Sequence, residues 1–122
     1  MAFTTRSAIT ELGGILVTDY DADQTEEDNV TGNTSGVIYL VDIDNTANTT
    51  AVYVKINDHA SAGGPGTTPI WTFMGEAGKR TSYVFEGGLT YSAGVTVWCT
   101  TGAAVADATD PASPVILSLI AS

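Results

Sequence analysis

The chain has 122 residues, 43% of them apolar and 15% charged, so it fits one domain with a core of its own. Its 14 acidic and 4 basic residues give a net charge of −10, which disfavours binding to nucleic acid and to acidic lipid surfaces. Val and Ile outnumber Leu by 19 to 6, a composition that excludes a helical bundle and favours strands.

Residues 1–12 precede the first extended run and mix Phe3, Ile9 and Leu12 with Thr and Ser. Their apolar content is too low for a core layer, so we predict an N-terminal arm that reaches a neighbouring subunit, followed by a domain over residues 13–122. The run at 14–20 predicts a first strand. The next segment, DYDADQTEEDN at 19–29, has no apolar periodicity, and turn residues follow it. These features predict a solvated acidic loop over residues 19–35.

The rest of the chain alternates short extended runs with turn residues. The runs predict strands at 36–45, 50–58, 70–74, 80–86, 94–102 and 115–121, with loops at 60–69 and 106–114. The connections TANT and GEAGK predict hairpins that join 36–45 to 50–58 and 70–74 to 80–86. About seven to eight antiparallel strands predict an all-β, single-domain β-sandwich, Ig-like or jelly-roll-like, with a small barrel as the alternative.

Alternation along each run predicts which side chains share a face. At 36–45, one face carries Val37, Tyr39, Val41 and Ile43 and the other carries Ile38 and Leu40, so both faces have large apolar residues. A two-layer sandwich needs one apolar face per sheet, and the surplus predicts burial against other chains. The candidate interface residues are Phe3, Ile9, Leu12, Tyr53, Trp71 and Trp98.

Residues suited to catalysis are few. His59 is the one histidine, and its place between a strand end and a Gly-rich loop predicts a solvated turn residue. Cys99 lies inside a strand run, which predicts a buried thiol, and a single cysteine cannot form an intrachain disulfide. We therefore expect no enzymatic activity and no cofactor.

Asp19, Asp21 and Asp23 have the spacing of a calcium loop, but Gln24 and Val30 stand where an EF-hand needs Gly and Glu. We expect no metal site, with an irregular calcium site as the alternative. Exposed Tyr and Trp rings leave a carbohydrate-binding module as a second alternative. The start MAFTTRSAIT lacks signal-peptide features and no apolar stretch reaches the length of a membrane helix, so we expect synthesis in a reducing cytoplasm and no membrane association.

Residues 36–121 resemble the small all-β virion proteins of tailed bacteriophages, particularly those of marine and cyanobacterial hosts. The resemblance rests on Asp44-Asn45-Thr46, Gly78-Lys79-Arg80, Phe85-Glu86-Gly87-Gly88-Leu89 and Val97-Trp98-Cys99-Thr100-Thr101. It implies a capsid decoration or cement protein on the exterior of the virion, made in the host cytoplasm, that clamps neighbouring major capsid subunits. It also implies self-association, which we expect to be trimeric. The alternative is a tail, collar or fibre component that binds a glycan or receptor.

Overall fold

The computed structural model describes residues 4–9 and 14–122, and within these ranges the chain forms strands, turns and bends. The strands are β1 (Thr4–Ile9), β2 (Gly14–Ala22), β3 (Gly36–Asp44), β4 (Val52–Asn57), β5 (Trp71–Gly75), β6 (Arg80–Tyr91), β7 (Thr96–Thr100) and β8 (Val115–Ala121). No helix within the described ranges is long and apolar enough to span a membrane.

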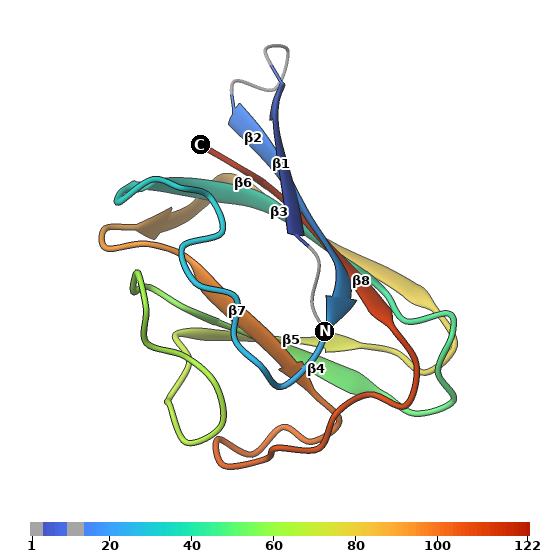
Figure 1. The fold of residues 1–122 in the computed structure, drawn as a ribbon. Coiled ribbons are helices and arrows are strands. Elements are labelled where there is room, and N and C mark those ends of the chain that lie inside the picture. The colour runs from blue at the N-terminus through green and yellow to red at the C-terminus, as the bar shows by residue number, and fades with distance from the viewer. Residues whose placement is uncertain (1–3, 10–13) are drawn as a thin grey trace.

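The strands form two antiparallel sheets that face each other (Figure 1). The larger sheet has the strand order β1-β2-β8-β3-β6, and the smaller sheet has the order β5-β4-β7. The predicted all-β sandwich of seven to eight antiparallel strands is confirmed. Each of the seven predicted runs contains a strand, and β1 is the eighth. Short β-branched runs thus form the two layers that the sequence predicts.

The core lies between the inner faces of the two sheets. Along β8 the side chains of Val115, Leu117 and Leu119 are buried and alternate with more exposed ones. Phe73 of β5 lies with its ring centroid 5.1 Å from that of Tyr83 and 5.4 Å from that of Phe85, both on β6. These half-buried rings close the side of the sandwich where β5 and β6 meet. Each fully buried aliphatic side chain stabilises the fold by about 1.5–3 kcal/mol.

The outer face of the smaller sheet is covered by loops of the same chain. Trp98 on β7 is only 1% exposed, and a Cβ at Gly63, in the β4–β5 loop, would lie 3.1 Å from its indole ring. Lys55 on β4 is fully buried and its Nζ donates a hydrogen bond to the Ala104 carbonyl at 2.7 Å. Its desolvation lowers the pKa of the amine. The prediction that the surplus apolar face at Trp98 is buried against another subunit is therefore wrong, because the chain's own loops cover it.

Neither predicted hairpin is present. β3 pairs with β6 and β8, whereas β4 pairs with β5 and β7, so the connection at 45–51 crosses from one sheet to the other. The connection from β5 to β6 at 76–79 also crosses. Turn residues mark where the chain reverses, but they do not specify whether the next strand pairs in the same sheet or packs across the core.

Two buried asparagines hold these crossings together at one end of the sandwich. Asn45 donates from Nδ2 to the carbonyls of Thr50, Gly75 and Glu76 at 2.9–3.4 Å. Asn48 donates to Asn45 Oδ1 at 2.9 Å and to the Ser113 carbonyl at 3.0 Å, and its Oδ1 accepts the Ser113 N–H at 2.7 Å. The connections β3–β4, β5–β6 and β7–β8 therefore share one hydrogen-bonded junction, which we call the asparagine junction.

Part of the predicted N-terminal arm is a strand in this subunit. β1 pairs with β2, with Thr5 opposite Thr18 and Arg6 opposite Val17, and forms one edge of the larger sheet. Phe3 and Leu12 lie outside the described residues, and of Ile9 only the backbone is described. Contact between the arm and a neighbouring subunit stays a prediction.

Candidate interaction surface

An apolar row crosses the outer face of the larger sheet. The register places Leu16 of β2 opposite Ile120 of β8, Ile120 opposite Leu40 of β3, and Leu40 opposite Val84 of β6. Directly opposed residues in antiparallel strands lie on the same face, so these four aliphatic side chains are neighbours. We call Leu16, Ile120, Leu40 and Val84 the apolar row.

A β-bulge in β3 determines which residues join this row. The register of β3 shifts between Ile38 and Leu40, so the alternation changes phase at Tyr39. Ile38, Val41 and Ile43 are all fully buried, while Leu40 is half-buried and lines a groove on the outer face. The sequence-based prediction that Ile38 lies on the face opposite Val41 and Ile43 is therefore wrong, because strict alternation assumes an unbroken pleat.

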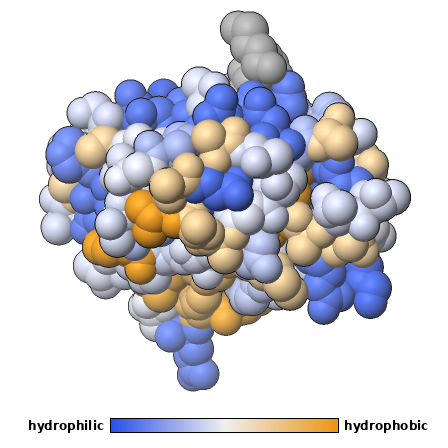
Figure 2. All heavy atoms as spheres, turned by 90° about the horizontal axis from the view of Figure 1, so that it is seen from below, coloured by the Kyte–Doolittle hydropathy of each residue, from blue (hydrophilic) through white to orange (hydrophobic). Residues whose placement is uncertain are grey.

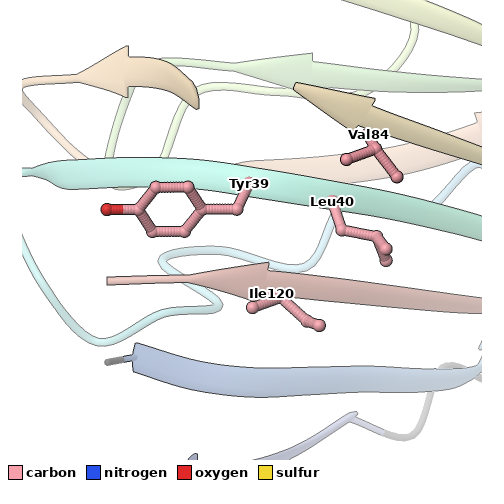
Figure 3. A pocket seen from close by; sticks show the side chains of 4 residues that line it. All are labelled: Tyr39, Leu40, Val84 and Ile120. Atoms are coloured by element: carbon pink, nitrogen blue, oxygen red, sulfur yellow. The ribbon is translucent and has the colours of Figure 1, made fainter. Parts of the chain in front are cut away.

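Three residues of the apolar row, Leu40, Val84 and Ile120, line a shallow groove of about 320 Å³ together with Tyr39. Figure 3 shows the four side chains coming from β3, β6 and β8, with the Tyr39 ring lying along β3. Val84 is 76% exposed and Tyr39 38%. Neighbouring apolar side chains exposed on a sheet face are typical of an interaction site, because covering them removes apolar area from water.

A polar row lies beside the apolar one. Asp42 of β3 is opposite Ser118 of β8 and Ser82 of β6. Its carboxylate accepts the Ser82 hydroxyl at 2.5 Å and the Arg80 guanidinium at 2.9 Å through Nε and Nη2. The charge of Asp42 is therefore balanced within the subunit, and the border of the apolar row is a neutral, hydrogen-bonded strip.

The structure does not bring the predicted interface residues together. Trp71 is half-buried against the core from the inner face of β5, because it lies opposite the buried Ile56. Tyr53 is half-buried on the outer side of the smaller sheet, and Trp98 is covered there by the loop at 58–70. Sequence reasoning missed the apolar row, although the period-two alternation of residues 80–86 places Val84 opposite to Tyr83 and Phe85 and could have indicated it.

The opposite side of the domain has a more mixed surface. Figure 2 views the domain from below Figure 1, where the smaller sheet and its loops lie, and shows apolar patches separated by hydrophilic residues. Ile70, Met74 and Val105 are exposed apolar residues of β5 and the nearby loops. Ile70 and Met74 belong to one stretch, where the exposed Thr72 separates them, and Val105 belongs to another loop. The apolar row is therefore the more regular surface.

The predicted solvated loop at 19–35 is in large part ordered structure. Residues 19–22 belong to β2, where Asp19 is 2% exposed. Residues 23–30, which we call the acidic strap, run beside β7 (Figure 1). The Cys99 N–H donates to the Asp23 carbonyl at 2.7 Å, and Glu27 exchanges hydrogen bonds with Val97 at 2.8 and 3.1 Å. The prediction of a solvated loop is wrong for this segment because its backbone pairs with the edge strand β7, whatever the charge of its side chains.

The acidic strap predicts a pH dependence of stability. A hydrogen bond with the Asp28 carboxyl, together with desolvation, raises the pKa of Glu26 to about 7. Since this pKa is raised on folding, its stabilising contribution is complete below the unfolded value and is lost as the pH rises through about 7. We expect the melting temperature to fall between about pH 5 and about pH 8, and Glu26→Gln to reduce that fall.

Glu76→Gln is the matched control, because Glu76 is an exposed acid that pairs with Lys79 at 3.3 Å outside the strap. Melting curves across the pH series compare the two variants with the unmodified chain. Equal pH slopes for Glu26→Gln and the unmodified chain would contradict this role of the strap.

The other residues suited to catalysis or metal binding are His59, Cys99 and the acidic side chains. His59 is exposed, and its Nδ1 accepts the N–H groups of Ser61 and Ala62 at 3.0 and 2.9 Å, which confirms the predicted turn histidine. Cys99 is fully buried, as predicted, and burial raises the pKa of its thiol to about 12. In the part of the chain that the structure describes, no three or more His, Cys, Asp and Glu side chains group to hold a metal ion.

No protein-family model, curated protein or solved structure matches this chain.

Proposed function

We propose that the chain is a non-enzymatic structural component of a tailed-bacteriophage particle, a decoration or cement protein that binds the major capsid protein on the exterior of the head. The apolar row is the observation that carries this proposal. It presents Leu16, Ile120, Leu40 and Val84 side by side on a strand-paired surface. The sequence resemblance of residues 36–121 to small virion proteins supports the same assignment.

A sheet face suits permanent attachment for a physical reason. Its side chains are held by the ladder and by the core behind them, so little conformational entropy is lost on binding. Burial of apolar area contributes about 25 cal/mol per Å², and the balanced Asp42–Arg80 pair leaves no uncompensated charge in the border. The outer face of the larger sheet can therefore be covered without burying a lone charge at that position.

The distribution of acidic residues favours one orientation on the particle. The acidic strap runs along β7, which belongs to the smaller sheet, whereas the apolar row lies on the outer face of the larger sheet. With the apolar row against the capsid, the strap points away from it. The strap would then keep the outside of the particle negative and soluble.

Ile120→Glu tests this assignment. A carboxylate in the middle of the apolar row would be desolvated on binding, so we expect affinity for particles that lack the protein to fall by at least about 100-fold. Val105→Glu is the matched control, because Val105 is an exposed apolar residue of the loop at 101–114. We expect it to bind like the unmodified chain. Co-sedimentation with particles measures the affinities, and unchanged binding of folded Ile120→Glu would contradict the proposal.

A further inference from the structure

The edge strands of the two sheets differ in length and in how far their free edges are covered. The outer edge of β7 is covered by the acidic strap through backbone hydrogen bonds, and β5 is only 5 residues long. β6 is the longest strand, with 12 residues, and among the described residues only β3 pairs with it. Its other edge presents backbone N–H and C=O groups that can pair with a further strand.

Residues 80–86 form the regular part of this edge. Exposed and half-buried side chains alternate without a break from Arg80 through Glu86. Gly87 and Gly88 have φ values of +80° and +79°, so the regular pleat ends there. The segment contains no proline, and its residues between the two charged ends are Thr, Ser, Tyr, Val and Phe. This stretch therefore lacks the proline or internal charge that commonly protects an edge strand.

Two copies of the segment RTSYVFE can pair antiparallel with Tyr83 of one copy opposite Tyr83 of the other. Arg80 then stands opposite Glu86 of a second copy, and Ser82 stands opposite Val84. Arg80, Ser82, Val84 and Glu86 are the exposed members of the alternation, so each of these pairs lies on one face. Arg80 binds Asp42 of its own subunit through Nε and Nη2, and its side chain is still 65% exposed. Its guanidinium can therefore add Glu86 of the second copy as a further ionic partner, and the two-fold symmetry repeats this contact.

The charge on β6 itself does not oppose this arrangement, although each chain carries a net charge of −10. β6 carries one basic and one acidic residue, Arg80 and Glu86, and is neutral overall. The acidic strap lies along β7, at the edge of the smaller sheet away from β5, whereas β6 contacts β5. The strongest negative charge is therefore on the far side of the sandwich from the edge of β6.

We propose that two copies of this chain pair through their β6 strands, antiparallel about a two-fold axis at Tyr83, and join their larger sheets into one continuous sheet. The pairing covers part of Val84, which is 76% exposed in the single subunit. It also places the two apolar rows on the same face of the joined sheet. The proposal goes beyond attachment to a capsid and holds whether or not the capsid is the partner. A two-fold axis closes as a dimer, in place of the trimer expected from the resemblance.

Charge reversal at Glu86 tests the pairing in solution. Glu86→Arg places two arginines opposite each other at both ends of the paired segment, so we expect the dimer dissociation constant to rise by at least about tenfold. Glu76→Arg makes the same change of net charge outside the strand and should leave the dimer intact. Sedimentation velocity over a concentration series measures both. A monomer or a trimer of the unmodified chain, or an unaffected dimer of Glu86→Arg, overturns the proposal.

Cysteine cross-linking tests the register even if a charge variant fails to fold. In the proposed pairing Ser82 of one copy is directly opposite Val84 of the other, a separation of about 4.5–5.5 Å between Cα atoms that suits a disulfide. A mixture of Ser82→Cys and Val84→Cys chains should therefore cross-link faster than either variant alone. Equal rates for the mixture and the separate chains overturn the register. Cys99 is buried in all of these chains and provides a common background.

Discussion

Replacing Asn45 with alanine is expected to lower the free energy of unfolding by about 3 kcal/mol or more, because several buried polar groups lose their partners together. The substitution removes the hydrogen bonds to the carbonyls of Thr50, Gly75 and Glu76 and the acceptor for Asn48. Domains of this size are stable by about 5–15 kcal/mol, so this is a large fraction of the total. Urea unfolding followed by circular dichroism measures the change.

Asn33→Ala is the matched control for the asparagine junction. Asn33 is exposed, and its hydrogen bonds with Thr31 are made by its backbone N–H and carbonyl. We expect a change within about 0.5 kcal/mol. If Asn45→Ala cost no more than Asn33→Ala, the three sheet-crossing connections would not depend on this junction.

Trp98→Ala is expected to destabilise the subunit by about 3–5 kcal/mol, the usual range for removing a large buried aromatic side chain. Trp98 is 1% exposed and its ring packs under the loop that contains Gly63, so the loss leaves a cavity between that loop and β7. The effect should appear in unfolding of the isolated chain. Self-association measured on the fraction that stays folded should be unchanged.

Trp98→Phe separates the packing contribution from any polar one. The indole Nε1 is buried and has no hydrogen-bond partner within the described structure, so phenylalanine loses volume but no hydrogen bond. We expect a smaller loss than for alanine, of about 1–2 kcal/mol. A Trp98→Ala chain with unchanged stability and weakened assembly would place the ring in an interface after all.

The strands could be predicted because each is a local pattern. The alternation of Val52, Val54 and Ile56 with Tyr53 is visible in the sequence and survives in β4. Which strands pair is not local, since it depends on the whole core. The hairpin predicted across TANT is instead a crossing between sheets that the asparagine junction holds, and the asparagine spacing alone does not reveal those distant partners.

The candidate surface was harder to predict for two physical reasons. The bulge at Tyr39 shifts the side chains that follow it by one position, and a single-residue irregularity leaves no clear mark in a pattern of apolar residues. Whether the outer face of the smaller sheet is buried depends on which loop folds over it. The loop with Gly63 covers Trp98 there, through contacts distant in sequence. The exposed Val84, by contrast, follows from simple alternation in residues 80–86.

Imaging of intact particles tests the proposed function most directly. The proposed function requires that a tailed phage encodes the chain, and it predicts that cryo-electron microscopy of that phage shows the domain on the exterior of the head. Leu40 and Ile120 should then lie against major capsid subunits. The acidic strap should face solvent. Mass spectrometry of the same particles establishes that the chain is present. Particles that lack the chain, or that carry it only in the tail, would contradict the assignment as a capsid decoration protein.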